Sequence, residues 1–154
     1  MVRTRHTSES DVLDELLCFD LYAASRALTR RYRPLLAEHG LTYPQYLVLV
    51  VLGSAGPSSI KELVGTLRLD HATLTPILRR MEEAGLLARD RDLDDARVVR
   101  LALTEHGARV HAVTETVKCR ISEDLGLAPD EAHHLQLALR DVATSAERAL
   151  KSAD

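Results

Sequence analysis

Cysteine is scarce in this chain, with two residues among 154, Cys18 and Cys119. Two thiols so far apart in sequence provide neither a disulfide framework nor the paired C-x-x-C spacing of a zinc site. In a reducing compartment both are expected to remain thiols until an oxidant arrives. Cys18 lies in a nearly uncharged run, ELLCFDLYAA, so it is either a small packing residue or a reactive thiol whose surroundings set its ionisation.

Long apolar runs are also missing. No stretch approaches the roughly 18 apolar residues of a membrane span, and the segment MVRTRHTSESDVLDE is polar and acidic where a signal peptide needs an apolar core. We therefore expect a cytoplasmic protein with no membrane partner. A composition of 45% hydrophobic and 28% charged residues suits one folded domain, residues 1–154.

An overall excess of positive charge is absent, because the formal net charge is −3. This counts against nucleic-acid binding, which usually needs a basic surface. Arginines nevertheless gather in two stretches, and each is either a DNA-contacting surface or an ordinary solvated face. The first holds Arg26, Arg30, Arg31 and Arg33, and the second holds Arg79, Arg80, Arg89, Arg91, Arg97 and Arg100.

Motifs for metal binding and catalysis are lacking as well. Six of the seven histidines, most of them expected at the surface, show no recognised ligand spacing: His39, His71, His106, His111, His133 and His134. Nothing resembles a peroxidase motif. We expect no metal, no cofactor and no catalytic activity.

Helical periodicity covers most of the chain, with Gly, Pro and Ser between the periodic segments. A first helix is predicted to begin after Ser10 or Asp11, to bend or restart at Pro34 and to end at Gly40. Over residues 16–24 it is apolar almost all round, so it must be covered on most sides, and a partner subunit can supply that cover.

Two short amphipathic helices follow a helix that is capped by Thr42 and has Pro44 in its first turn. They meet at residues 68–70, where Asp70 is placed to cap the second helix, and Gly85 is placed to close it. Their apolar faces are Ile60, Leu63, Val64 and Leu67 in one helix and Leu74, Ile77, Leu78 and Met81 in the other. The pattern is typical of a helix-turn-helix, whose second helix lies in the major groove, although an ordinary helical hairpin has the same periodicity.

The segment LLARDRDLDDARVVRLALT is strand-like, with two short runs joined by a polar turn. A hairpin directly after a helix-turn-helix indicates a winged helix. Arg97, beside Asp94 and Asp95 in the turn, is predicted to enter a minor groove, and a surface ion pair with Asp95 is the alternative.

Two more helices are predicted after the hairpin. Thr104 caps the first, which carries an apolar stripe of Val110, Val113, Val117 and Ile121. Pro129 opens the second, whose stripe is Leu135, Leu139, Val142 and Ala146. The predicted fold is mainly α with a small β-hairpin wing: a winged helix-turn-helix lobe at 42–104 and dimerisation helices at 10–40 and 105–151.

These segments resemble the MarR family of dimeric winged-helix repressors, and within it the regulators of organic hydroperoxide resistance. The resemblance rests on LCFDLYAASRALTRRYRPLL, GLTYPQYLVLVVL, IKELVGTLRLDHATLTPILRRMEEAGLLARDRD and DDARVVRLALTEHG, and it covers about residues 12–107. It implies a homodimeric, redox-sensing repressor that leaves double-stranded operator DNA on oxidation by an organic hydroperoxide or a related oxidant. A MarR-type repressor gated by a small phenolic ligand is the alternative.

The resemblance also implies site residues. Cys18 matches the peroxide-sensing cysteine of the LCF motif. Tyr32 and Tyr43 match tyrosines that hydrogen-bond this sulfur from the other subunit, and Tyr22 matches a tyrosine near the site; core packing is the alternative role of these tyrosines. Cys119 lies where some members carry a second cysteine that condenses with the oxidised sensor across the dimer, and a small packing residue is its alternative. DNA contacts are expected from Asp70, His71, Thr73, Thr75, Arg79, Arg80 and Arg97.

Three residues depart from the family pattern. His71 and Ala72 stand where Ser and Gly are expected at the start of the recognition helix, and Ala96 replaces an acidic residue of the wing. The resemblance therefore does not imply an operator sequence.

Helix geometry adds a constraint on the sensor. Tyr22 shares the helix face of Cys18, whereas Asp20 points away from it. Tyr32 lies about 21 Å from Cys18 along a straight helix, so unless the chain folds back it reaches only the sulfur of a partner in a two-fold dimer. A phenol that donates to the sulfur stabilises the thiolate, which is the species that a peroxide oxidises.

Overall fold

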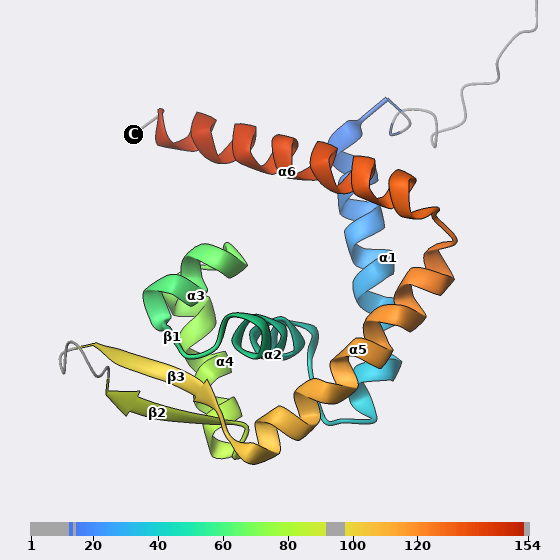
Figure 1. Cartoon of the computed structure of the whole chain (residues 1–154). Coiled ribbons are helices and arrows are strands. Elements are labelled where there is room, and N and C mark those ends of the chain that lie inside the picture. Colours follow the sequence, from blue (N-terminus) through green and yellow to red (C-terminus); the bar gives the residue numbers. More distant parts are fainter. Residues whose placement is uncertain (1–12, 14, 92–97, 153–154) are drawn as a thin grey trace, which may run out of the picture. The chain divides into compact units, whose positions relative to one another are not determined.

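The computed structural model describes residues 13, 15–91 and 98–152 (Figure 1). The described part contains six helices and a three-stranded antiparallel sheet, as the predicted fold class requires. The helices are α1 (Leu17–Ala37), α2 (Tyr43–Ala55), α3 (Ile60–Leu67), α4 (His71–Glu83), α5 (Glu105–Leu125) and α6 (Pro129–Lys151), and the strands are β1 (Ser58–Ser59), β2 (Leu87–Arg91) and β3 (Val99–Leu103). The chain divides into two compact units, residues 1–117 and 118–154.

Helix α1 begins later than predicted. It starts at Leu17 with Leu16 as the N-cap, and the predicted cap residues Ser10 and Asp11 lie outside the described residues. No residue in the first half of α1 is buried, and a helix gains most of its stability from packing. Its apolar side chains are exposed within the single chain: Leu16 (48%), Leu17 (61%), Phe19 (39%) and Tyr22 (56%).

Pro34 was predicted to bend or to restart this helix. A restart is wrong, because the helix continues through Pro34 to Ala37. Tyr32 and Leu36, both buried, hold it on either side of the proline, so packing offsets the hydrogen bond that proline removes. Gly40, with a φ of +65°, ends the segment in the predicted left-handed conformation.

The core of the first unit is built from α2, α3, α4 and β3. Its fully buried side chains are Val48, Leu49, Leu63, Leu74, Leu78, Met81 and Leu101. Helix α2 begins as predicted after Thr42, whose N–H donates to the side-chain oxygen of Gln45 at 2.8 Å, and Pro44 lies in its first turn. The predicted pair of short helices is confirmed, and both turn apolar residues into this core.

The sheet has the order β1-β3-β2. Strands β2 and β3 form the predicted hairpin, with Leu87 opposite Leu103 and Arg91 opposite Val99. The turn at 92–97 lies outside the described residues. Strand β1 was not predicted, because two residues are too few to carry a periodic pattern.

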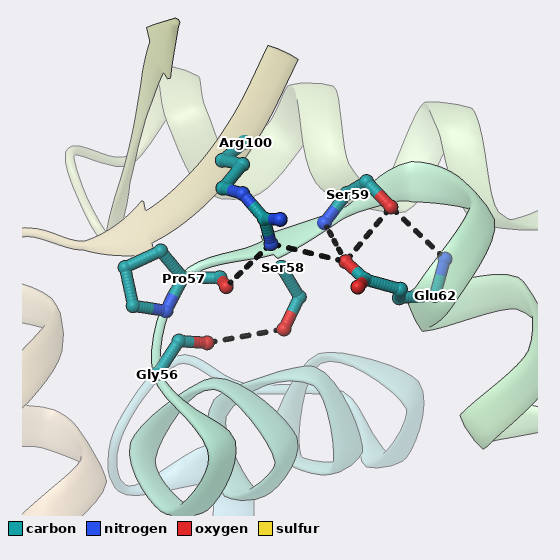
Figure 2. A network of polar contacts seen from close by, with 6 residues as sticks. All are labelled: Gly56, Pro57, Ser58, Ser59, Glu62 and Arg100. Atoms are coloured by element: carbon teal, nitrogen blue, oxygen red, sulfur yellow. Dashed lines mark hydrogen bonds and ion pairs between the residues drawn. The ribbon is translucent and has the colours of Figure 1, made fainter. Parts of the chain in front are cut away.

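A polar network joins β1, β3 and the start of α3 (Figure 2). Arg100 Nη1 donates to the carbonyl of Pro57 at 3.2 Å and to Oε2 of Glu62 at 3.3 Å. The same carboxylate oxygen accepts from the N–H of Ser59 at 2.7 Å, and the Ser59 hydroxyl accepts from the N–H of Glu62 at 3.2 Å. Arg100 therefore joins β3, near the turn end of the hairpin, to the capping box at the N-terminus of α3.

Thr104 caps α5, as predicted, and also binds the segment that follows α4. Its Oγ1 accepts from the N–H of Gly107 at 2.9 Å and donates to the carbonyl of Gly85 at 2.6 Å. Gly85 has a φ of +70° and ends α4. Gly107 packs so closely on the backbone carbonyl of Leu86 that a Cβ there would overlap it.

The predicted stripes of the last two helices differ in exposure. On α5, Val117 and Ile121 are buried. Helix α6 begins at Pro129 as predicted, but none of its residues is buried, and its stripe is exposed within the single chain: Leu135 (49%), Leu139 (41%) and Val142 (40%). In the part of the chain that the structure describes, no helix combines the length and apolar character needed to cross a membrane.

Gly107→Ala should lower the free energy of unfolding by about 1–3 kcal/mol, because the added methyl group meets rigid backbone at Leu86. The matched control is Gly65→Ala in α3, where a Cβ meets nothing within 4 Å. There alanine should raise stability by up to about 1 kcal/mol. Urea denaturation at one protein concentration measures both, and equal stabilities of the two variants would contradict the close contact.

Candidate functional site

Helix α4 turns one side into the core and the other to solvent. Leu74, Leu78 and Met81 are fully buried, which fixes the rotation of the helix about its axis. The exposed side carries five of the residues predicted to contact DNA: His71, Thr73, Thr75, Arg79 and Arg80. We call the exposed residues of α4 its outer face. The structure therefore brings these five side chains together on one surface.

Asp70 caps α4. Its Oδ1 accepts from the N–H of Thr73 at 2.6 Å. This hydrogen bond lowers the pKa of Asp70 below its ordinary value, so the carboxylate is ionised at neutral pH. A negative charge complements the helix N-terminus, and Asp70 thereby positions the residues of the outer face that follow it.

Two ion pairs lie beside the outer face. Arg89 of β2 donates to both carboxylate oxygens of Glu82 in α4, at 2.5 and 3.0 Å, and these bonds raise the pKa of Arg89. The pair braces the hairpin against the helix. Arg79 and Glu83 lie 3.0 Å apart in an exposed pair, which solvent weakens, so Arg79 can exchange this partner for a phosphate at little cost. Arg97, the predicted minor-groove residue, lies outside the described residues.

Cys18 is exposed in the first turn of α1. Tyr22, one turn later on the same face, is also exposed, and its hydroxyl accepts from Arg26 Nη1 at 2.7 Å. The Arg26 guanidinium lies 5.4 Å from the centre of the same ring. The arginine thus holds the phenol on the side of the helix that carries the thiol.

Three tyrosines form a cluster where α1 meets α2. The ring centre of Tyr32 lies 4.7 Å from that of Tyr43 and 5.3 Å from that of Tyr46. The structure therefore brings together two of the predicted tyrosines, but neither Cys18 nor Tyr22 joins them, because along α1 Tyr32 lies about 21 Å from Cys18 and about 15 Å from Tyr22. Tyr46 was missed, although its position three residues after Tyr43 on α2 places it on the same helix side.

Burial sets the chemistry of this cluster. It raises the pKa of Tyr32 to about 12, with smaller contributions from the charge of Tyr46 and a hydrogen bond between the two hydroxyls. Burial is also the main cause of the raised pKa of Tyr43 and of Tyr46. All three phenols therefore keep their protons at neutral pH and act as hydrogen-bond donors.

Cys119 is exposed on α5, in the second unit. An exposed thiol has no packing role within the chain, which weakens the alternative that it is a small core residue. Among the described residues, no three His, Cys, Asp or Glu side chains lie close enough to hold a metal ion.

A cavity of about 270 Å³ adjoins the tyrosine cluster. Its walls are mostly apolar, and Arg33 is the charged residue among them. Such a volume lies just below the usual range of small-molecule pockets, which begins at about 300 Å³. The lining residues are Thr29, Arg33, Ala37, Leu41, Thr42, Tyr43 and Pro44.

Known proteins with similar sequences are transcriptional regulators. A profile of the MarR family matches residues 41–99. The organic hydroperoxide resistance transcriptional regulator of Bacillus subtilis is 48% identical over 62% of this chain and 65% of that protein. The regulator MgrA of Staphylococcus aureus is 35% identical over 88% of this chain and 92% of that protein. The regulator TtmR of Methylorubrum extorquens is 44% identical over 80% of this chain and 63% of that protein. The matches to the Bacillus and Methylorubrum regulators therefore each span less than two thirds of the relative's own length.

Solved structures of AbfR from Staphylococcus epidermidis resemble this fold. Overoxidised AbfR bound to DNA is 33% identical, with coverage of 89% of this chain and 96% of the other and a TM-score of 0.69. Disulfide-formed AbfR is 30% identical, with coverage of 93% and 95% and a TM-score of 0.60.

Tyr32 should be detectable in an alkaline titration. Because its pKa rises from 10.0 to about 12 on folding, its contribution to stability is complete below pH 10 and is lost as pH rises to 12. Tyr32→Phe should therefore remove the latest component of the tyrosinate absorbance and flatten the fall in stability over this range. Tyr22→Phe, the control outside the cluster, should keep that component, and a late component that persists in Tyr32→Phe would contradict the assignment.

Proposed function

Since the chain belongs to the MarR family of DNA-binding transcriptional regulators, we propose that it is a repressor that leaves its operator when an organic hydroperoxide oxidises Cys18. One observation carries the proposal. The chain exposes a thiol on α1 and holds a cluster of protonated phenols about 21 Å away, so neither is a complete sensor within one subunit. A cytoplasmic location, where thiols are kept reduced, is part of this proposal.

A homodimer completes the sensor. Helices α1 and α6 expose apolar side chains that water does not favour, and we assign residues 10–40 and 105–151 to the dimer interface. In a two-fold dimer each contact occurs twice, so the phenols of Tyr32 and Tyr43 of one subunit face Cys18 of the other. Phenol donors stabilise the thiolate at Cys18 and thereby increase its reactivity.

The oxidation is stoichiometric. The Cys18 thiolate attacks the peroxide oxygen that is not bonded to carbon, the O–O bond breaks, and the alcohol leaves after taking up a proton. Cys18 becomes a sulfenic acid, two electrons having passed from sulfur to the peroxide. The protein does not turn over, which agrees with relatives that are regulators and not enzymes.

Cys119 supplies the second step of the proposal. Its thiol attacks the sulfenic sulfur of the partner subunit's Cys18, an S–S bond forms, and water leaves. AbfR provides two forms for comparison, because its overoxidised form is bound to DNA and a disulfide form also exists. By analogy we assign release from DNA to the disulfide and not to the oxidation of one sulfur alone.

Operator binding is assigned to the winged helix-turn-helix lobe, residues 42–104. The outer face of α4 enters the major groove, and Arg97 at the hairpin turn enters the flanking minor groove. Dimeric proteins of this kind contact half-sites about one helical turn apart, roughly 34–36 Å.

A second candidate is a repressor gated by a small phenolic ligand. The cavity beside Tyr43 favours it, since Arg33 can pair with a carboxylate while the apolar walls hold a ring. Titration of the operator complex with cumene hydroperoxide and, separately, with aromatic acids distinguishes the two functions. Release by the acids alone would favour ligand gating.

Cys18→Ser should bind operator DNA with the affinity of the parent but should not release it on addition of cumene hydroperoxide. The hydroxyl keeps the size of the side chain and removes the nucleophilic sulfur. Fluorescence anisotropy of labelled DNA measures both properties. Release of the variant at the parent rate would exclude Cys18 as the sensor.

Cys119→Ser should abolish the covalent dimer that the parent forms after one equivalent of cumene hydroperoxide, as seen by non-reducing electrophoresis. Its Cys18 should still react and then proceed to sulfinic acid, which mass spectrometry identifies. We expect this variant to stay on DNA. A parent that leaves DNA without forming a covalent dimer would show that Cys119 has no part in the signal.

A further inference from the structure

We propose that the outer face of α4 reads the 5-methyl groups of thymine, so that each operator half-site carries thymine beneath the first two turns of the helix. The inference rests on the proposed function in one respect, namely that α4 is the helix that enters the major groove. It concerns which bases that helix selects.

The centre of the outer face is hydrocarbon. At about 100° of rotation per residue, Ala72 and Pro76 lie within about 30° of the direction opposite to the buried residues Leu74, Leu78 and Met81. Both are exposed and stand one turn apart. Recognition helices contact base edges with their N-terminal residues, and these two residues occupy that part of α4.

A polar group at the side of this centre is already engaged. The hydroxyl of Thr75 donates to the carbonyl of His71 at 2.7 Å, so its proton is held by the helix backbone. Proline, in addition, has no N–H to offer to a base. The centre of the surface consists of the Ala72 methyl and the Pro76 ring, with Thr73 and Thr75 on either side and His71 and Arg79 at the two ends.

Hydrocarbon of this kind discriminates among base pairs in the major groove. All four bases present hydrogen-bonding groups there, the O4 of thymine included, and burying such groups against hydrocarbon without a hydrogen bond is unfavourable. Thymine alone presents a methyl group. The outer face thus favours thymine at its centre, while His71 and Arg79 remain available for polar contacts at the edges.

The experiment begins with duplexes enriched by the reduced parent protein from a random pool. Footprinting identifies the half-sites that the protein protects. Thymines in these half-sites are then replaced one at a time by deoxyuridine, which lacks the methyl group and keeps the Watson–Crick hydrogen bonds. Each contacted methyl should contribute about fourfold to affinity. Deoxyuridine outside the protected sites is the control and should have no effect.

A matched pair of variants locates the contact. In Ala72→Ser, which places a hydroxyl at the centre of the outer face, the deoxyuridine effect at one position should fall below twofold. Ala84→Ser makes the same chemical change at the exposed C-cap of α4 and should keep the full effect. Enriched duplexes that bind equally well with thymine and deoxyuridine would overturn this inference and leave DNA reading by α4 intact. A protein that enriches no sequence at all would overturn both.

Discussion

The burial of Leu74, Leu78 and Met81 is the constraint on which the rest of the DNA-binding lobe depends. Truncating one such side chain to alanine typically costs about 2–5 kcal/mol, so α4 cannot rotate about its axis without losing much of the stability of the fold. The residues that face solvent on α4 are therefore set by those that face inward. The core thus determines which side chains reach DNA, although it contacts none itself.

Local chemistry made much of this fold predictable. Thr42, Asp70 and Thr104 were each predicted to begin a helix, and each does. The side chains of Asp70 and Thr104 accept from N–H groups of the first turn, and at Thr42 the side chain of Gln45 accepts from the N–H of the cap residue. The hairpin was also predictable, since the alternation of apolar and polar residues along a strand can be read from a few neighbouring residues. The helical periodicity also predicted which side of α4 is exposed, whereas the five residues expected there to contact DNA came from the family resemblance and stay a prediction.

Features that depend on distant residues were not predictable in this way. Strand β1 exists because β3 offers it a partner, and its two residues carry no signal of their own. Tyr46 belongs to a cluster that forms only when α1 packs on α2. The start of α1 was placed too early because Ser10 and Asp11 are good cap residues, although α1 has Leu16 as its N-cap. The sensor also stays a proposal, because its thiol and its phenols are far apart in one chain. Contacts between two subunits leave no periodic pattern in the sequence of one of them.

The hydroxyl of Thr104 lies between two helices with different tasks, accepting from the first turn of α5 and donating to the residue that closes α4. Any displacement of the start of α5 is therefore passed on to the end of α4 through bonds that already exist. In the dimer proposed above, the distance between the two copies of α4 would depend on how the two α5 helices are held. DNA offers its successive major grooves at a fixed repeat, so a change of a few ångströms in that distance leaves one copy facing a groove and the other facing the backbone. The affinity for the operator would therefore depend on the distance between the two subunits.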